Sequence, residues 1–215
     1  MDKGERDMPT KRFYRLSEEK RRIIQEAALH EFARVPFDKA SINQIIKEAG
    51  ISRGSFYTYF EDKWDVLACI FEENRRMLEM TMQQEMESSG GNIWEMLETV
   101  LNKAISLSSG PEQVQFVRNV MEHISSDTIF RNLHQKGVME SGSMEGEMTR
   151  WLYAHYSREK LRELDYKEFV AFYQMAMVSI AMEIKAYFEG KSIDKIQESY
   201  RLKMALLKRG LCPSV

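Results

Sequence analysis

The sequence predicts an all-α protein, and three observations support that class. Eleven glycines and four prolines among 215 residues leave few helix breakers. Glu, Lys, Met, Leu, Ala and Arg are abundant, and these side chains lose little freedom in a helix. Apolar residues recur at three- and four-residue spacing over most of the chain, as they do on one face of a helix. With 43% hydrophobic and 30% charged residues, the composition is that of a soluble globular protein with a core.

The chain is expected to begin with a short arm and one helix. Residues 1–16 are charged and carry no apolar stripe, so we expect a mobile basic arm. Ser17 begins the first helix, with Glu18 and Glu19 in the first turn, where the helix dipole favours acidic side chains. The helix runs to about residue 34. Pro36 ends it, because the residue before a proline avoids the helical region.

Two short helices follow around a turn. Ser41 begins the first of them, and Ser41 and Gln44 have the spacing of a capping box, in which two side chains satisfy the free amides at a helix start. Gly50 ends this helix. Ser52 caps the next helix, residues 53–60. Apolar residues fall where the two helices must pack together: Ile42, Ile45, Ile46, Ile51, Phe56 and Phe60.

Residues 64–215 are expected to form a helical body. A long helix follows Asp62 to about residue 87, and Ser-Ser-Gly-Gly at 88–91 breaks the chain. The remaining predicted helices cover about residues 92–107, 111–124, 128–136, 147–155, 166–188 and 193–208. No uninterrupted apolar run approaches 18 residues, so we expect no membrane span.

The last two long helices are apolar on more than one side. The first carries one stripe of Phe169, Phe172, Ala176, Ile180 and Ile184 and a second of Val170, Met177, Ala181 and Phe188. The second has Leu202, Ala205 and Leu206 apart from its main apolar face. One face can enter the core while the other pairs with a symmetry mate. The alternative is a monomer with a thick core.

Residues 41–60, SINQIIKEAGISRGSFYTYF, have the organisation of a helix-turn-helix. The outer face of the second helix contains no acidic residue and consists of Arg53, Gly54, Ser55, Tyr57, Thr58 and Tyr59. Small and hydroxyl-bearing side chains let a helix approach base edges and phosphates in the major groove of DNA. Residues 1–63 hold thirteen Lys/Arg and eleven Asp/Glu, against eighteen and twenty-two in the remainder. The pattern favours DNA binding, with an ordinary three-helix bundle as the alternative.

From about Ile23 to Leu67 the sequence resembles the tetracycline-repressor (TetR) family of regulators. The resemblance is strongest in GISRGSFYTYFEDKWDVL, where Tyr57, Phe60 and Lys63 have the spacing of the family signature. Pro36 stands where the family usually has Gly, which changes a turn but none of the DNA-facing positions. The resemblance implies that Ser41 and Lys63 bind phosphate, that Arg53, Gly54 and Ser55 face the groove, and that Tyr57 and Tyr59 reach backbone or base.

The resemblance also implies an organisation and a mechanism. Residues 17–63 would be the DNA-binding domain, and residues 64–215 a helical ligand-binding and dimerisation domain. A homodimer formed by the last two long helices would bind a pseudo-palindromic double-stranded operator and repress transcription until a small molecule releases it. The helix after Asp62 would carry the signal between the two domains. A helical adaptor and a constitutive DNA-binding protein without an effector are the alternatives.

Candidate ligand-binding residues are apolar or aromatic positions of the predicted body, together with one carboxylate: Trp94, Phe116, Glu122, Trp151, Tyr173 and Met177. The fifteen methionines could line an adaptable pocket. Ordinary core packing is the alternative for the apolar residues. Glu122 and Glu183 could each face a cationic ligand, and a salt bridge or contact with solvent is the alternative for both.

No pattern of an enzyme is present. The four histidines lack metal-ligand spacing, and the sequence has neither a glycine-rich phosphate loop nor a nucleophile elbow. We therefore expect no catalysis, no metal and no cofactor. Cys69 and Cys212 lie far apart and form no motif, which favours a reducing compartment. The N-terminus lacks the apolar segment of a signal peptide, so a cytoplasmic protein is expected.

Overall fold

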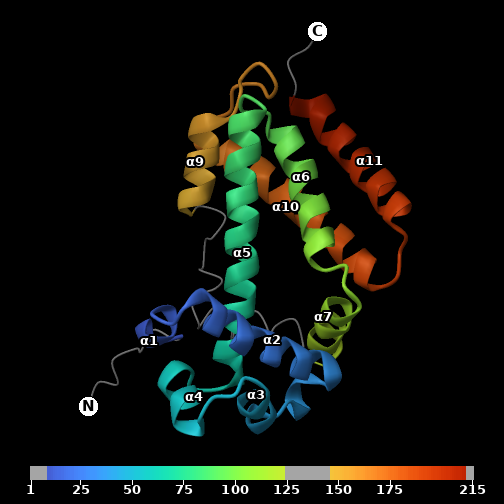
Figure 1. Cartoon of the computed structure of the whole chain (residues 1–215). Helices are drawn as coiled ribbons and strands as arrows, with labels where there is room; N and C mark the ends of the chain where they lie inside the picture. The colour runs from blue at the N-terminus through green and yellow to red at the C-terminus, as the bar shows by residue number, and fades with distance from the viewer. Residues whose placement is uncertain (1–8, 124–145, 212–215) are drawn as a thin grey trace, which may run out of the picture. The chain divides into compact units, whose positions relative to one another are not determined.

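The computed structural model describes residues 9–123 and 146–211, and within these ranges every regular element is helical (Figure 1). The predicted all-α class is therefore confirmed. The short helix expected near residues 128–136, and the Gly/Ser/Met segment after it, lie outside the described residues.

The helices of the first part are α1 (Lys11–Tyr14), α2 (Glu18–Arg34), the 3-10 helix η1 (Phe37–Lys39), α3 (Ile42–Glu48), α4 (Arg53–Tyr59) and α5 (Lys63–Ser88). Four of them, α2 to α5, begin and end close to the predicted residues, while α1 and the 3-10 helix η1 were not predicted. Ser17 caps α2 by accepting a hydrogen bond from the Lys20 amide, and Ser52 caps α4 by accepting one from the Ser55 amide. Both caps satisfy amides that the first turn of a helix leaves free.

The later helices also match the predicted pattern. They are α6 (Ile93–Leu107), α7 (Pro111–His123), α9 (Glu147–His155), α10 (Tyr166–Phe188) and α11 (Ile193–Leu211). Asn92 caps α6, and Asp165 and Glu168 form a complete capping box at the start of α10. The capping box at α10 fixes the first residue of the helix that carries most of the outward apolar side chains described below.

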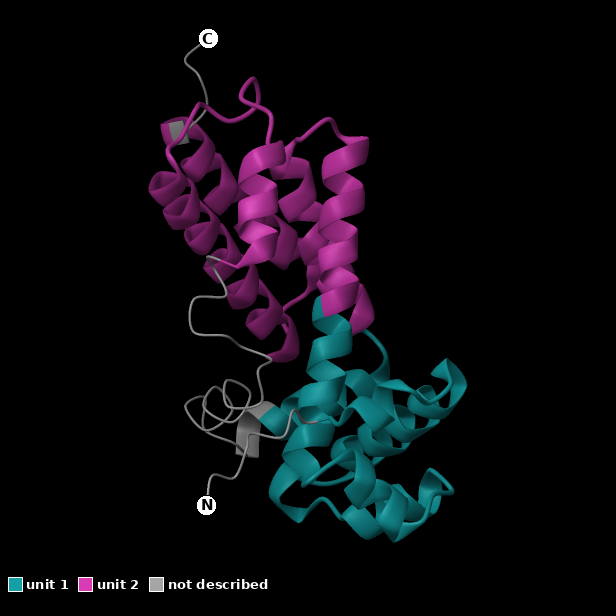
Figure 2. Cartoon of the chain, turned by 90° about the vertical axis from the view of Figure 1, so that its left-hand side faces the viewer, with its two compact units in different colours: residues 1–75, 109–141 teal, residues 76–108, 142–215 magenta. Residues whose placement is uncertain are grey.

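The chain divides into two compact units (Figure 2). The first, the head unit, contains residues 1–75 and 109–141, and the second, the body unit, contains residues 76–108 and 142–215. This division differs from the predicted boundary at residue 63. The first turns of α5 and the whole of α7 belong to the head unit, whereas both were expected in the body.

Helix α7 joins the head unit because it packs along α2. The Phe116 ring stacks on Phe32 at 6.2 Å between centroids and also meets Phe71. Asn119 is buried, and its amide nitrogen reaches the carbonyl oxygens of Phe32, Ala33 and Val35 at 2.9, 2.8 and 3.2 Å. A helix leaves its last carbonyls without partners, so Asn119 completes the C-terminal end of α2 from 84 or more residues away.

The expected mobile arm is ordered from residue 9 onward. The Thr10 amide donates to the Tyr59 carbonyl (3.0 Å), and the Thr10 hydroxyl donates to the Thr58 carbonyl (2.8 Å). Phe13 is 1% exposed and lies 4.9 Å, between ring centroids, from Phe60. These contacts hold α1 against the C-terminal end of α4. The arm prediction was therefore wrong for residues 9–16, while residues 1–8 lie outside the described part.

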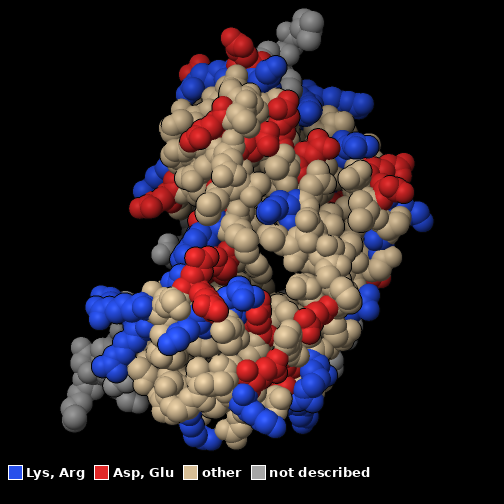
Figure 3. Space-filling view, in the orientation of Figure 1, with Lys and Arg blue, Asp and Glu red and all other residues tan. Residues whose placement is uncertain are grey.

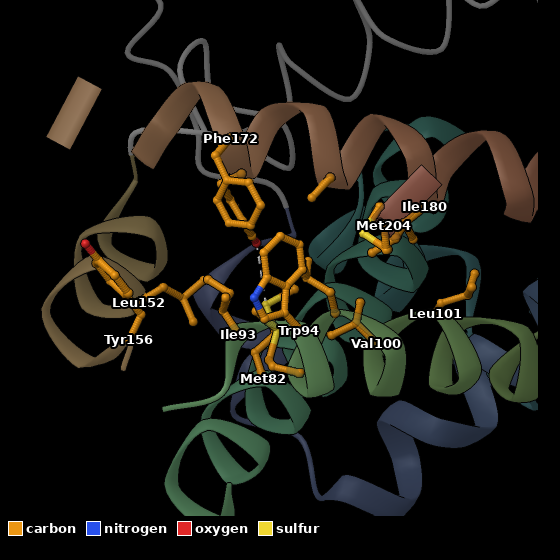
Figure 4. Close-up of a cluster of buried hydrophobic side chains, with 14 of the residues drawn as sticks. Met82, Ile93, Trp94, Val100, Leu101, Leu152, Tyr156, Phe172, Ile180 and Met204 are labelled. Carbon is orange, nitrogen blue, oxygen red and sulfur yellow. Dashed lines mark hydrogen bonds between the residues drawn. The ribbon is translucent and has the colours of Figure 1, made fainter. Parts of the chain in front are cut away.

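The body unit has its own core of aromatic, branched and methionine side chains (Figure 4). Trp94 of α6 meets Phe172 of α10 at 5.2 Å between centroids, and its indole N–H donates to the Lys160 carbonyl. Helix α11 contributes Ile196, Tyr200 and Met204, all buried. Four buried methionines in this core, Met82, Met86, Met96 and Met204, support the core-packing interpretation of these residues.

Glu183 ties α10 to α11 inside the body unit. Its side chain is 1% exposed and accepts hydrogen bonds from Lys203 and Ser199, each at 2.6 Å. Burial would raise the pKa of Glu183, but these two hydrogen bonds and the charges of Lys203 and Lys191 outweigh it and hold the pKa below its ordinary value. Of the two interpretations of Glu183, the salt-bridged carboxylate is confirmed.

The outward apolar face of α10 differs from the predicted second stripe. Val170 and Phe188 are buried in the body core, whereas Met175, Val178 and Met182 are exposed. On α11, Leu202 and Leu206 are exposed as expected. By length and composition α10 alone, among the described helices, could cross a membrane, but eight of its residues are buried. Core helices of soluble proteins pass the same test, so this is weak evidence for a span.

Candidate nucleic-acid interface

Helices α3 and α4 form a helix-turn-helix within the head unit. Gly50 between them has φ of +63°, a left-handed conformation that costs glycine little and other residues more. The Ile51 amide then donates to the Ile46 carbonyl at 3.2 Å and closes the turn. Ile45 and Phe56 are completely buried between the helices. The buried pair fixes which side of α4 faces solvent.

The exposed side of α4 carries Arg53, Gly54 and Tyr57. The Arg53 guanidinium lies over the Tyr57 ring at 5.4 Å and donates to the side-chain oxygen of Asn43 at 2.8 Å. Asn43 belongs to α3, so these contacts connect the exposed sides of both helices. Sequence reasoning missed Asn43, although its place as the second residue of the helix and the polarity of its side chain were visible signals.

Not all residues expected on this face lie there. Tyr59 is half-buried against Phe13, 6.2 Å between ring centroids, and packs on the head core. The Thr58 hydroxyl donates to the Gly54 carbonyl, and Ser55 pairs with Ser52 at the helix start. The structure therefore brings Arg53, Gly54 and Tyr57 together and turns Tyr59 away from them.

Ser41 begins α3 as predicted, but the capping box with Gln44 is absent. The Ser41 side chain makes no capping hydrogen bond. The Ser41 amide instead donates at 2.8 Å to Glu31, a buried carboxylate of α2 that also binds Arg34. A carboxylate from α2 thus takes the role expected of Gln44.

Lys63 is bound to backbone rather than extended into solvent. Its ammonium donates to the carbonyl oxygens of Phe37, Asp38 and Ala40 at 2.7, 2.9 and 3.5 Å. Partial burial lowers the pKa of Lys63, against the opposing charges of Asp38 and Asp62. Lys63 therefore closes the η1 turn, in which Pro36 provides the N-cap. This role is structural, and it differs from the phosphate contact that the resemblance implies.

A shallow depression of about 340 Å³ lies beside the exposed side of α4. Its lining includes two cations, Arg53 and Lys63, and hydrogen-bonding groups of Ser41, Asn43 and Tyr57. Asp62 also lines it. Figure 3 shows Lys and Arg side chains on the head unit in the view of Figure 1. The depression combines donors from α3 and α4 in one place, as phosphate contacts on DNA require, whereas the Lys63 ammonium is already bound to three carbonyls.

The candidate ligand residues divide between the two units. Trp94, Trp151, Tyr173 and Met177 belong to the body core or pack against it. Phe116 belongs to the core of the head unit, which corrects its predicted place in the body. Glu122 lies in α7, which is part of the head, but its side chain lies outside the described residues. In residues 9–123 and 146–211, no three His, Cys, Asp or Glu side chains are grouped to hold a metal ion.

Comparison with known proteins identifies the family. The model described as "Bacterial regulatory proteins, tetR family" matches residues 24–69, and "Tetracyclin repressor-like, C-terminal domain" matches residues 92–211. The second match alone spans more than half of the chain. A tetR-family protein from Shewanella sp. PV-4 has a similar fold, with a TM-score of 0.54 and 18% identity over 91% of this chain and 99% of that chain.

Two regulators are similar in sequence. The fatty acid metabolism regulator protein of Bacillus subtilis is 22% identical over 147 residues, which are 64% of this chain and 75% of that protein. The HTH-type transcriptional regulator SrpR of Pseudomonas putida is 24% identical over 139 residues, 65% of this chain and 59% of that protein. With both family models matched and an exposed α4 face free of acidic residues, this chain belongs to the tetR family of bacterial transcriptional regulators.

Proposed function

We propose that this regulator binds a pseudo-palindromic operator as a homodimer, represses transcription, and is released by a small molecule. The observation that carries DNA recognition is the exposed side of α4, where Arg53 lies over Tyr57 and is held by Asn43. A guanidinium in a fixed position suits the two acceptors that guanine presents in the major groove. Regulators of this family are typically cytoplasmic and not enzymes, and we extend both properties to this chain.

Replacing Arg53 or Tyr57 by Ala is expected to weaken operator binding while the protein stays folded. Both side chains are exposed, so little core packing is lost beyond the edge contact of the Tyr57 ring with buried Phe56. A good base contact contributes about 1–3 kcal/mol, so each variant should lose that much binding free energy on a duplex selected by the wild type from a random-sequence library. Fluorescence anisotropy measures it, with exposed Arg162→Ala of the body unit as the control.

Two results would contradict this assignment. If the wild type enriches no duplex, the protein is a helical adaptor rather than a DNA-binding regulator. If the wild type binds a selected duplex but Arg53→Ala and Tyr57→Ala bind it equally well, another surface recognises the bases.

The effector is proposed to bind in the body unit. Two phenols in its core support an apolar ligand with a hydrogen-bonding group. The Tyr200 hydroxyl is buried with no partner among the described residues, and the Tyr173 hydroxyl reaches only the Met82 sulfur at 3.7 Å. Burial raises the pKa of both phenols, assisted by the charges of Glu98 and Glu79, so each is neutral and can donate to a ligand.

A small molecule that releases the operator must bind the operator-bound protein less tightly than the free protein. Coupling free energies between two sites are commonly about 1–3 kcal/mol and are equal in both directions. We therefore expect a compound found by thermal-shift screening to bind roughly 5- to 150-fold more weakly when the selected duplex is present. Calorimetric titration with and without duplex measures this ratio. Equal affinity in the two titrations would show that the compound does not release the operator and would favour a constitutive DNA-binding protein.

A further inference from the structure

Helix α1 and the start of α2 carry a concentrated positive surface. Residues 11–22 contain six Lys or Arg and two Glu. Four of these cations, Lys11, Arg12, Arg15 and Lys20, are exposed and are called here the α1 basic surface. In Figure 3 blue side chains gather over this part of the head unit. The tetR-family match begins only at residue 24, so this surface precedes the matched helix-turn-helix region.

The cations of this surface are not neutralised within the described part of the chain. No ion pair described in residues 9–123 and 146–211 engages Lys11, Arg12, Arg15 or Lys20, whereas neighbouring Arg22 pairs with Glu26 at 2.6 Å. Glu18 and Glu19 lie in the first turn of α2, where the helix dipole accounts for them. A surface cluster of like charges creates a positive potential that attracts an anionic partner.

Helix α1 is fixed to the recognition helix. Thr10 donates two hydrogen bonds to the last carbonyls of α4, those of Thr58 and Tyr59. Phe13 is buried against Tyr59 and Phe60. On the other side, Arg21 of α2 donates to the Tyr14 carbonyl at 3.2 Å. The basic surface therefore keeps a set position relative to α4, unlike the mobile arm that the sequence suggested.

We propose that the α1 basic surface is a second DNA-contact site, which binds backbone phosphates of the duplex beside the groove that α4 enters. The proposal rests on the proposed function of α4. Phosphate contacts carry no sequence information, but they fix the register and orientation of a DNA-binding protein. Because Thr10 and Phe13 anchor the surface to α4, each phosphate bound there also restrains the recognition helix. Binding to an anionic membrane would not require the surface to be attached to α4, so the attachment favours DNA as the partner.

The test is the salt dependence of duplex binding. The variant Lys11→Gln/Arg12→Gln/Arg15→Gln removes three exposed charges and no core contact. Each phosphate contact contributes about 0.9 to the slope of log affinity against log salt concentration. We expect the slope to fall by about 2–3 units for each bound chain, and so by about 5 for the dimer, and affinity to fall equally for the selected duplex and for an unrelated duplex of the same length. The matched control is Lys103→Gln/Lys167→Gln/Lys195→Gln, three exposed positions of the body unit.

The possible outcomes separate this proposal from the proposed function. A wild type that enriches no duplex refutes the proposed function. A wild type that binds its selected duplex, with an unchanged slope in the α1 variant, overturns the second contact site alone. Unchanged duplex binding together with lost binding to phosphatidylserine vesicles would also overturn it and assign the surface to a membrane. A fall in slope equal to that of the control variant would show only an effect of net charge.

Discussion

Replacing Val178 by Glu is expected to convert the protein from a dimer into monomers and to weaken operator binding at least about 100-fold, because joining two DNA-binding sites raises affinity by two to four orders of magnitude. The same result is expected for Leu206→Glu. Each substitution would place a carboxylate in an apolar interface, where a charge without a partner is costly.

The basis of this expectation is the outward face of the last two helices. Met175, Val178 and Met182 of α10 are 51%, 55% and 57% exposed, and Leu202 and Leu206 of α11 are 65% and 59% exposed. A depression of about 590 Å³ lies between these helices, lined largely by apolar side chains. Large exposed apolar patches mark interaction sites, and a two-fold dimer buries the same patch of both copies.

Sedimentation and light scattering at micromolar concentration measure the assembly, and anisotropy with the selected duplex measures the affinity. Asn102→Glu, an exposed position on α6, introduces the same charge elsewhere in the body unit and should leave a dimer with wild-type affinity. A wild type of about 25 kDa, the mass of one chain, would refute the dimer. If the Val178→Glu and Leu206→Glu variants remain dimers, another face of the protein forms the dimer interface.

Asn119→Ala is expected to destabilise the end of α2 by about 2–3 kcal/mol, because buried carbonyls that lose their donor keep the full cost of desolvation. The Asn119 amide is the donor for three carbonyls of residues 32–35, so its removal leaves the C-terminal end of α2 uncapped. Hydrogen exchange of the amides in α2, measured by mass spectrometry, reports the free energy of local opening there.

A second variant separates the cap from ordinary packing of α7. Gln115 donates to the side-chain oxygen of Asn119 at 2.9 Å, so Gln115→Ala removes a neighbouring hydrogen bond without touching the three carbonyls. Exchange in α2 should then stay close to that of the wild type. Equal protection of α2 in the wild type and Asn119→Ala would mean that the packing of Phe116 on Phe32, rather than the amide, holds α7 in the head unit.

The helices themselves were predictable from local signals. Ser52 and Asn92 accept the hydrogen bonds expected of N-cap residues, and Gly50 adopts the left-handed conformation expected at a helix end. The buried side of α3 and α4 also followed from apolar spacing, as complete burial of Ile45 and Phe56 illustrates. The rules for helix caps succeed because each cap and its partner lie within four residues of each other.

The differences arise where a distant residue takes part. The capping box at Ser41 is replaced by Glu31, ten residues earlier in the chain. Helix α7 was assigned to the body, but Asn119 and Phe116 place it in the head through contacts with α2 that no local pattern contains. Thr10 and Phe13 likewise order α1 through residues more than 40 positions away.

Only part of the candidate interface could be predicted, because some of its residues are positioned by contacts with distant parts of the chain. Arg53, Gly54 and Tyr57 share one side of α4, as the helical period requires. The same period turns Tyr59 toward Phe13, so its assignment to that side did not follow from geometry. Lys63 binds three carbonyls of residues 37–40, a contact that depends on how the chain folds back after Pro36.

Selection of binding sites from a random-sequence duplex library tests the central claim most directly. Two recognition helices related by a two-fold axis can enter successive major grooves only about 34–36 Å apart, or a multiple of that distance. We therefore predict an enriched pseudo-palindrome whose half-sites are centred about 10 base pairs apart or a multiple, bound by two chains. Enrichment of no sequence, or of an asymmetric site bound by one chain, would contradict the account.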